Sequence, residues 1–413
     1  MHATESPATA PVFPEPWEPP FDDGEPFMFD PMHSPFVVTP LTAEVMALAS
    51  GAGLTQAAQE MDVPLAGYDA RERNYYHFTR FTPIVPESDE DAQRMGAAAE
   101  ASGQRELGRM TERWQGEHLP RLFELTTQLQ QNLPAEATNA ELLASLDEAV
   151  AITSEAWTIH FRIALPMLLS MQIFDEFYAE LFGGTEADGH ALIVGLESES
   201  VKAGFGISDL AALAREQGLA PVIIATPSDA LLPALGELAA GQTFLTALNA
   251  YLDSYGLRQD LFDFAVPTWR EDPSPALAAV RAYLLSGRDA RAEHAAMAAS
   301  AEAAQAAARE QLAVYPEAVR GQFEALLQFA RYGAFLQEEH NFYIDQRIMA
   351  LTRLLALRIG ERLVQEGWLQ APEDIFLLYL NEVRAILAGV PQGTPASTQG
   401  VVVRRRAEMA QAA

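Results

Sequence analysis

Residues 139–182 read NAELLASLDEAVAITSEAWTIHFRIALPMLLSMQIFDEFYAELF, and this stretch decides the fold. Leu, Ala and Glu recur through it, and these residues are strong helix formers. Further segments with a similar composition and helical pattern occur at about 88–132, 208–218, 227–256, 274–287, 289–312, 316–366 and 373–388. Because strands and helices do not alternate, a parallel α/β sheet is disfavoured. We therefore predict a mainly all-α protein with a large multi-helix body and little β structure.

Two segments near the start of the chain depart from a simple helical pattern. Residues 41–60 read as a helix that is broken near Gly51 and Gly53. The stretch 68–84 is rich in β-branched and aromatic residues, which favour extended structure. A short extended region is therefore expected after the first helix.

The N-terminal arm has its own composition. Residues 1–40 hold ten of the 26 prolines, and proline fixes φ and removes a backbone donor. The arm also carries several aromatic residues, which a free disordered tail rarely has. We expect an extended arm that packs over the body. The predicted organisation is an acidic, Pro-rich arm at 1–27, a helical domain at 28–388, and a linker with a C-terminal tail at 389–413.

Charge and composition limit the classes of partner. The chain of 413 residues carries a formal net charge of −30, which repels phosphate backbones and anionic lipid surfaces. We therefore expect neither nucleic acid nor membrane as a partner. It contains no cysteine, so disulfides and thiolate sites are excluded, and a cytoplasmic location is expected.

Familiar catalytic motifs are missing from the sequence. The sole lysine, Lys202, does not stand in a Walker loop, and no Gly-x-Gly-x-x-Gly, Gly-x-Ser-x-Gly or His-Glu-x-x-His motif occurs. A di-metal helical bundle would need Glu-x-x-His pairs, and none is present. We therefore predict no metal site.

The first candidate constellation is Asp-Pro-Met-His-Ser-Pro at 30–35, which leads into a helix. Thr39 and Pro40 suit a helix start, so a purely structural role is one interpretation. The other is that His33 faces a cleft as a proton acceptor or phosphate contact, because its pKa can lie near neutrality.

The second constellation spans residues 255–273. Asp272 followed by proline can cap a helix, and Trp269 can fill a core. Alternatively, a loop between two helices presents Arg258 and Arg270 to a phosphate or carboxylate, which a guanidinium fork binds well.

The third constellation lies on a late helix. At 100° per residue, Arg331, Glu338 and Asp345 fall within about 40° of one another. Phe342 lies on the same side. A buried ion network is one interpretation, and the wall of an apolar pocket with a few polar groups is the other. A fourth stretch, 371–377, reads as a turn with acidic residues at a helix N-terminus.

Taken together, these segments resemble a known family. The motifs are Phe-Asp-Pro-Met-His-Ser-Pro at 29–35, Tyr-Gly-Leu-Arg at 255–258, Pro-Thr-Trp-Arg-Glu-Asp-Pro at 267–273, Glu-Glu-His-Asn-Phe-Tyr-Ile-Asp at 338–345 and Pro-Glu-Asp-Ile-Phe at 372–376. Their order and spacing are similar to the central domain of phosphoenolpyruvate-synthase-like dikinases, a family that includes rifampin phosphotransferase and the phenylphosphate synthase group.

The resemblance implies an acceptor-binding domain. In this family an ATP-grasp domain phosphorylates a histidine on a swivelling domain, which carries the phosphoryl group to an acceptor. Neither the ATP-grasp domain nor the phosphohistidine motif is present in this sequence. The resemblance therefore implies partner subunits that supply both, together with ATP and Mg, and no cofactor bound by this chain itself.

The expected activity is phosphorylation of a phenol or other hydrophobic alcohol, as a component of a multi-subunit phosphotransferase. His33 or His340 would accept the proton, and Arg258 or Arg270 would stabilise charge on the transferred group. The remaining predicted contacts to the acceptor or phosphate are Trp269, Arg331, Glu338, Phe342, Tyr343 and Asp345. The alternative is a non-catalytic helical binding or scaffold protein derived from the same domain.

Overall fold

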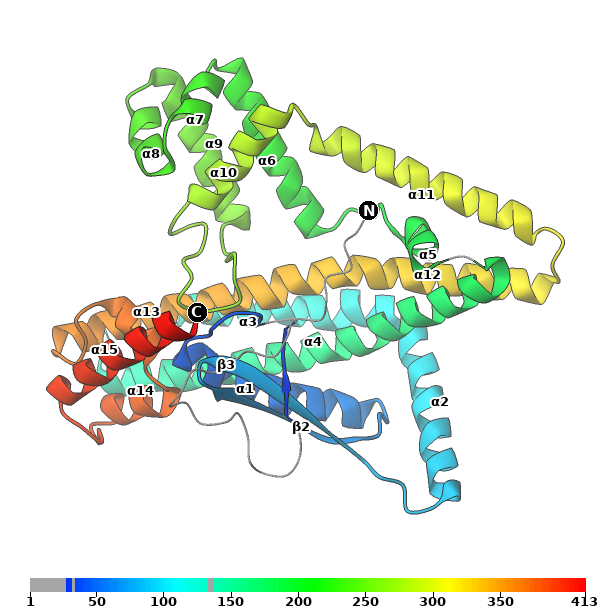
Figure 1. The fold of residues 1–413 in the computed structure, drawn as a ribbon, viewed down its shortest axis with the longest axis horizontal. Helices are drawn as coiled ribbons and strands as arrows, with labels where there is room; N and C mark the ends of the chain where they lie inside the picture. Colours follow the sequence, from blue (N-terminus) through cyan, green and yellow to red (C-terminus); the bar gives the residue numbers. More distant parts are fainter. Residues whose placement is uncertain (1–26, 32–33, 133–136, 184) are drawn as a thin grey trace.

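The computed structural model describes residues 27–31, 34–132, 137–183 and 185–413. Helices dominate these residues, and the strands form one small sheet, so the predicted all-α class is confirmed (Figure 1). His33 lies outside the described residues, as does nearly all of the predicted arm at 1–27.

The N-terminal half contains β1 (Met28–Phe29), α1 (Pro40–Glu60), β2 (Leu65–Arg73), β3 (Tyr76–Pro83), α2 (Asp89–Arg113), the π-helix η1 (Trp114–His118), α3 (Leu119–Gln131) and α4 (Asn139–Phe182). The middle contains α5 (Glu186–Ile193), α6 (Glu199–Glu216), α7 (Ala220–Ala225), α8 (Ser228–Gly236), α9 (Ala239–Tyr255) and α10 (Ser274–Ser286). The C-terminal part contains α11 (Ala290–Leu312), α12 (Glu317–His340), the π-helix η2 (Asn341–Ile348), α13 (Met349–Gln365), the 3-10 helix η3 (Pro372–Leu377), α14 (Leu380–Leu387) and α15 (Pro395–Ala412).

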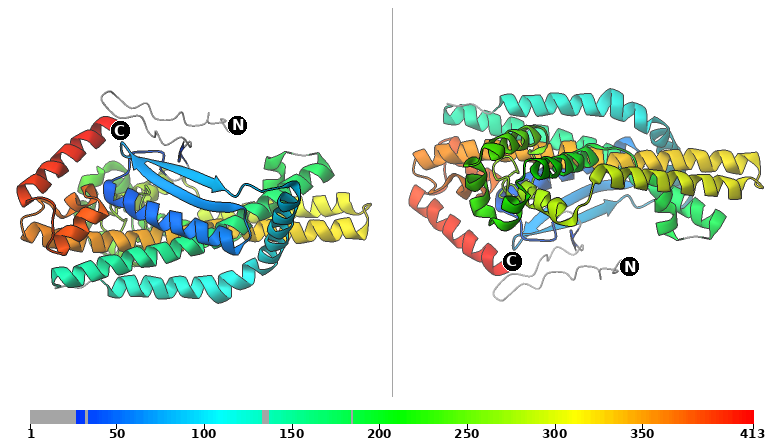
Figure 2. Two further views of the ribbon diagram at one scale, coloured as in Figure 1. Left: turned by 90° about the horizontal axis from the view of Figure 1, so that it is seen from below. Right: turned by 90° about the horizontal axis from the view of Figure 1, so that it is seen from above.

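The 44-residue helix α4 is the central rod of the molecule. A capping box starts it, since Thr138 accepts from the Glu141 backbone and the Glu141 carboxylate accepts from Thr138. Gly183 ends it with a φ of 64°, which glycine adopts without strain. α1, α12 and α13 pack along α4, and with η2 these helices form what we call the long-helix body (Figures 1 and 2).

The predicted break in the first helix is wrong, because α1 runs without interruption through both glycines. A Cβ on Gly53 would lie 2.8–3.0 Å from the backbone of Trp157 and Thr158. The glycine therefore lets α1 approach α4 closely at Trp157.

A three-stranded antiparallel sheet covers α1, in the order β1-β3-β2 (Figure 2). β2 and β3 form a hairpin around Asn74 and Tyr75, whose φ values of 54° and 66° lie in the left-handed region. This hairpin confirms the extended region predicted at 68–84. β1 joins the sheet through pairing of Met28 with Thr79, and from here on we call the described segment 27–31 that contains it the arm.

Helices α6–α10 form a separate small core that stands on the long-helix body, which we call the α6–α10 bundle (Figure 1). α11 leads from the bundle back to α12. The loop 256–273 between α9 and α10 descends from the bundle to the body, and we call it the connector (Figure 1).

The C-terminal region is more ordered than a linker and tail. Residues 389–394 form the connection, and α15 begins at Pro395 behind an N-cap at Thr394. Arg405 of α15 pairs with Glu382 of α14 at 2.6 Å, so the last helix is held against the body.

In the described chain, no single helix is both long and apolar enough to cross a bilayer. One sharply bent pair, α8 with α9, meets the length and composition test only when its two helices are taken together.

Candidate functional site

The connector is anchored in the body by a buried carboxylate. Asp263 is almost fully buried and accepts hydrogen bonds from the Thr39 backbone (2.6 Å), the Thr39 hydroxyl (2.8 Å), the Thr42 hydroxyl (3.1 Å) and the Ala265 backbone (2.7 Å). Burial raises the pKa of Asp263, while these donors oppose that effect. The carboxylate thus ties the connector to the first turn of α1.

A buried arginine makes the second anchor. Arg353 of α13 is 3% exposed and holds Glu271 of the connector through two hydrogen bonds of 3.0 and 2.9 Å. It also donates to the carbonyl of Phe264, whose ring is buried in the body. The connector therefore takes a fixed position against both α1 and α13.

An apolar pocket of about 360 Å³ opens where the arm, the sheet, α1, α4 and the connector meet. Its wall contains aromatic and aliphatic side chains from all five segments: Met28, Phe29, Pro31, Met46, Leu54, Tyr68, Phe81, Trp157, Phe161 and Phe262. Asp30, Ser50, His77 and Thr79 add polar groups. A few polar groups in an apolar wall are typical of a small-molecule site. We call this space the arm pocket.

The arm pocket contains both a hydrogen-bond donor that stays protonated and groups that can accept a proton. Tyr68 lines the pocket, and burial, together with the Asp30 carboxylate, raises the pKa of Tyr68 to about 12. The phenol therefore stays neutral at physiological pH and can donate a hydrogen bond. Asp30 and His77 are the pocket residues that can accept a proton.

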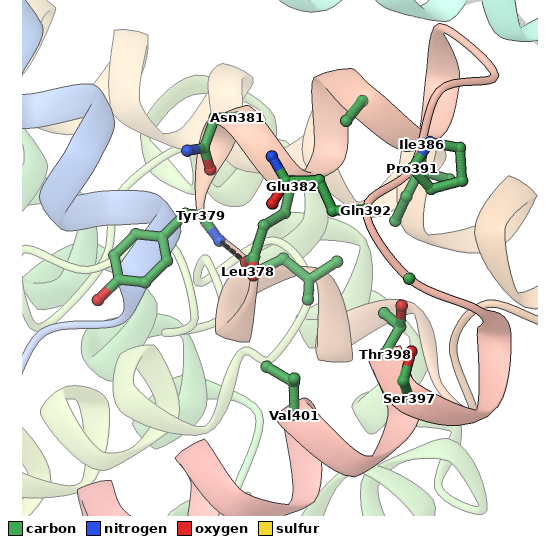
Figure 3. Close-up of a pocket in the computed structure, with 12 residues that line it drawn as sticks. Leu378, Tyr379, Asn381, Glu382, Ile386, Pro391, Gln392, Ser397, Thr398 and Val401 are labelled. Carbon is green, nitrogen blue, oxygen red and sulfur yellow. Dashed lines mark hydrogen bonds between the residues drawn. The ribbon is translucent and has the colours of Figure 1, made fainter.

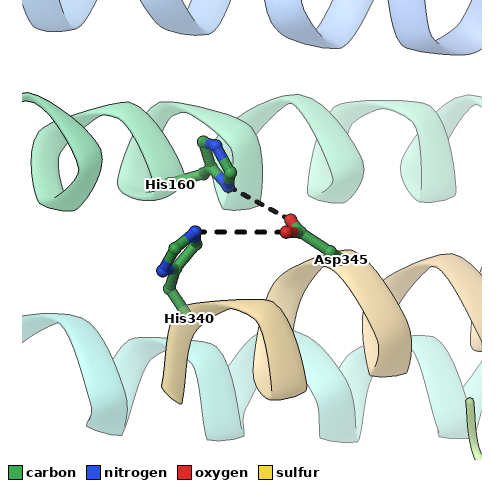
Figure 4. A group of neighbouring side chains, drawn as sticks. All are labelled: His160, His340 and Asp345. Carbon is green, nitrogen blue, oxygen red and sulfur yellow. Dashed lines mark hydrogen bonds and ion pairs between the residues drawn. The ribbon is translucent and has the colours of Figure 1, made fainter. Parts of the chain in front are cut away.

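A cluster of three side chains lies behind the aromatic wall of the arm pocket. His160 of α4 stacks on Trp157 with ring centroids 4.5 Å apart and meets Phe161 edge-on at 5.0 Å. Its Nδ1 lies 3.1 Å from Oδ1 of Asp345, and His340 Nε2 lies 4.0 Å from the other carboxylate oxygen (Figure 4). This His160–His340–Asp345 cluster joins α4 to α12 and η2.

A second pocket, of about 330 Å³, lies between α14 and α15 (Figure 3). Its charged group, Glu382, accepts from the Tyr379 backbone at 2.7 Å and pairs with Arg405. The Glu382 carboxylate already caps α14 and pairs with α15. This pocket is therefore a weaker candidate for a ligand site than the arm pocket.

The structure places the predicted connector residues outside the arm pocket. The Arg258 guanidinium stacks over Trp269 at 4.4 Å, and the Trp269 indole donates to Asp260 at 2.7 Å. Arg270 is exposed and pairs with Asp253 at 3.0 Å. These residues thus contact one another and nearby acidic side chains of α9 and the connector. Their predicted role in binding a phosphate stays a prediction.

The three charges expected on one face of the late helix do not meet. Arg331 lines a groove against α2, Glu338 is exposed beside α6, and Asp345 faces α4. For Asp345 the reason is η2, because a π-helix turns less per residue than an α-helix and rotates Asp345 away from the α-helical face. Arg331 and Glu338 both lie on α12, two turns apart, and contact different neighbours.

Two of the three predicted aromatic contacts, Phe342 and Tyr343, are buried in the body. Phe342 and Tyr343 meet edge-to-face at 5.0 Å, and Tyr343 also contacts Trp114 of η1. Burial raises the pKa of Tyr343 to about 12. Neither ring lines the arm pocket. His340 is buried as well, with Nδ1 donating to the Leu336 carbonyl at 2.7 Å.

Sequence reasoning missed Trp157, His160, Phe161 and His77. The first three stand in the quoted helix as Trp-Thr-Ile-His-Phe, a histidine flanked by aromatic residues in the longest apolar helix. That local pattern is a usable signal, whereas His77 has none beyond its place in the extended region.

Comparison with known proteins supports the resemblance seen in the motifs. Residues 159–338 match the family described as the rifampicin phosphotransferase fourth domain. Chondramide synthase cmdD of Chondromyces crocatus is 30% identical over 395 residues, which cover 94% of this chain and 10% of that protein. The uncharacterized phosphotransferase YvkC of Bacillus subtilis (strain 168) is 26% identical over 282 residues, which cover 67% of this chain and 33% of that protein.

The chain thus spans a third or less of the length of these curated relatives. The matched segment 159–338 runs from the middle of α4 almost to the end of α12 and includes the α6–α10 bundle and the connector. Over this segment the chain is therefore similar to the fourth domain of rifampicin phosphotransferase, and the comparisons fit the predicted resemblance to phosphoenolpyruvate-utilising dikinases.

Proposed function

We propose that this chain holds the acceptor of a dikinase-type phosphotransferase, and that the acceptor is a phenol or another hydrophobic alcohol in the arm pocket. The observation that supports the proposal is that segments far apart in the chain together line one apolar pocket, the arm pocket. The arm supplies Phe29, the connector supplies Phe262, and α4 supplies Trp157.

The size and lining of the arm pocket support this class of acceptor. A volume of about 360 Å³ suits a compact ligand with one or two rings, and small-molecule sites begin near this size. Trp157, Phe161 and Phe262 offer ring faces and edges that an aromatic acceptor can contact. The polar groups on the arm and sheet side can orient a hydroxyl.

In the proposed reaction, the acceptor oxygen attacks the phosphorus of a phosphohistidine on a partner. The P–O bond forms as the P–N bond breaks, the hydroxyl proton passes to a base, and the partner's imidazole leaves. His77 and Asp30 are the best-placed bases because they line the pocket. His33 stays a prediction, and His340 would act only through the cluster behind Trp157.

The partners are part of the proposal. An ATP-grasp component would use ATP and Mg to phosphorylate the swivelling histidine component, and this chain would act only with both. The net charge of −30 favours partner surfaces that carry basic residues.

The first test is binding. Isothermal calorimetry on the purified chain with p-cresol and with toluene compares two ligands of similar shape that differ in the hydroxyl. We expect p-cresol to bind at least tenfold more tightly. Met28→Trp should fill the pocket mouth and abolish binding. Met297→Trp is the matched control, because Met297 is also an exposed methionine but lies in a groove between α5, α6, α11 and α12.

The second test separates catalysis from scaffolding. The chain is mixed with an ATP-grasp component, a histidine component, ATP and Mg, and a phenol that binds, and ³¹P NMR follows the formation of an aryl phosphate. Binding without any phosphate ester would favour the scaffold alternative. Equal binding by Met28→Trp and the wild type would place the acceptor elsewhere.

A further inference from the structure

We propose that the His160–His340–Asp345 cluster is a binding site for a first-row transition-metal dication such as Zn²⁺. The three side chains offer two imidazole nitrogens and a carboxylate oxygen, and their ligand atoms all lie within 4.8 Å of one another. This inference stands on the cluster alone and does not depend on the proposed acceptor.

The distances suit a shared ion. His160 Nδ1 lies 3.1 Å from Asp345 Oδ1, and His340 Nε2 lies 4.0 Å from Asp345 Oδ2 (Figure 4). Two ligands at about 2.0–2.2 Å from one Zn²⁺ are separated by roughly 3–4 Å. Only small side-chain shifts are therefore needed for all three ligand atoms to coordinate one ion.

The hydrogen bonding of His340 leaves its Nε2 atom suited to binding a metal cation. The Leu336 carbonyl can only accept, so His340 Nδ1 carries the proton in their 2.7 Å hydrogen bond. In a neutral imidazole Nε2 then carries the lone pair, and Nε2 lies 4.0 Å from Oδ2 of Asp345. A cation placed between a nitrogen lone pair and a carboxylate stabilises both. A carbonyl that holds the far nitrogen is also the usual second partner of a metal-bound histidine.

The surroundings hold the ligands in place. Trp157 stacks on the His160 ring at 4.5 Å, and the two imidazoles meet edge-to-face at 4.7 Å. η2 turns Asp345 toward α4, and π-helical segments occur often at functional sites. Both histidines are buried, whereas the Asp345 side chain is 18% exposed.

The ligand types decide the class of metal. Imidazole suits zinc, iron, nickel, copper and cobalt, whereas calcium and magnesium prefer all-oxygen sites. Three protein ligands leave a coordination position open to water or a small ligand.

The experiment uses the full chain after dialysis against a chelator. Co²⁺ is added and its visible d–d absorption is followed, Zn²⁺ then competes, and metal content is measured after desalting. We expect one equivalent of Co²⁺, displaced by Zn²⁺, and a higher melting temperature with Zn²⁺. Asp345→Asn and His340→Gln should weaken binding at least 100-fold.

His190→Gln is the matched control, because His190 is an exposed histidine that lies 3.7 Å from a carboxylate of Asp175. This variant should bind as the wild type does. Because the wild type is measured directly, a variant that folds poorly does not decide the result, and circular dichroism identifies such a variant. The proposal is overturned if the chelator-treated wild type takes up no metal, or if Asp345→Asn binds as tightly as the wild type.

Discussion

The long-helix body with its attached connector and the α6–α10 bundle are both helical, yet they bury different kinds of side chain. Asp263 of the connector, Arg353 of α13 and Glu339 of α12 are buried charged groups. Helices α6–α10, all of which the structure describes, bury no charged side chain, and their core is made of residues such as Phe244 and Leu277. These three groups hold segments that lie far apart in the chain, since Asp263 accepts from Thr39, Arg353 donates to Glu271 and Glu339 accepts from the Glu199 backbone.

The difference indicates two kinds of stability. An apolar core tolerates changes of shape better than changes of polarity, since volume-conserving swaps are usually mild. A buried charge depends on its partners, since removal of one partner leaves the other desolvated and uncompensated. The predictions below test whether this contrast holds, from the largest expected effect to the smallest.

Arg353→Leu should produce the largest loss. The change removes the partner of Glu271 and the donor to Phe264, and broken buried ion pairs cost about 3–5 kcal/mol of unfolding free energy. Chemical denaturation measures it. Arg358→Leu on the same helix is the control, because Arg358 and its partner Glu361 are each 48% exposed, and it should cost less than about 1 kcal/mol. Equal losses for the two would remove the contrast.

His118 should make the body sensitive to acid. Burial, with help from the charges of Arg113 and Arg162, lowers the pKa of His118 to about 4 from 6.5. Because the folded pKa is below the unfolded one, this contribution to stability is complete above about pH 6.5 and is lost progressively as the pH falls from 6.5 to about 4. The wild type should lose up to about 3 kcal/mol more than His118→Gln between pH 7 and pH 4.

Denaturation curves recorded across this pH range measure the His118 effect. His294→Gln on α11 is the matched control, since His294 is more exposed, and its pH dependence should follow that of the wild type. If His118→Gln loses stability in parallel with the wild type, the acid sensitivity comes from other groups.

Phe244→Leu probes the apolar side of the comparison. Phe244 is fully buried in the α6–α10 bundle among aliphatic side chains, so the smaller ring-free residue should cost about 1–2 kcal/mol. Hydrogen exchange should show the loss mainly within α6–α10, while the arm pocket still binds its ligand. Loss of ligand binding with this variant would show that the bundle and the pocket are coupled.

Arg270→Ala should have the smallest effect. Its pair with Asp253 is more than half exposed on both sides, so the expected cost is about 0.5 kcal/mol or less. A melting curve checks this. If phosphoryl transfer falls strongly while the melting curve stays unchanged, Arg270 acts on the transferred group, as its motif predicted.

Much of the fold could be predicted from local pattern. The helix at 139–182 was predicted at its observed boundaries, and the hairpin overlaps most of the extended stretch predicted at 68–84 but begins earlier, at Leu65. The predicted helix break at Gly51 and Gly53 was wrong. Helix propensity does not show that a glycine is present because two helices pack closely, as α1 and α4 do at Gly53. The start of α15 at Pro395 was missed because its turn-forming residues act as an N-terminal cap.

The site was less predictable. The connector motif correctly marked an important loop, but its arginines lie outside the arm pocket, while the neighbouring Phe262 lines it. Helical periodicity placed Asp345 on the face of Arg331 and Glu338, because an α-helix was assumed where η2 forms.

By itself, the sequence determined the helical class, the main boundaries and the ordered motifs that mark a dikinase-like relative, because these depend on local propensity and on residues close in the chain. Only the tertiary structure brought His160 within 3.1 Å of Asp345, 185 residues away, and joined the arm, connector and α4 around one pocket. The physical reason is that contacts between distant segments depend on how whole helices pack and turn, which no local pattern records.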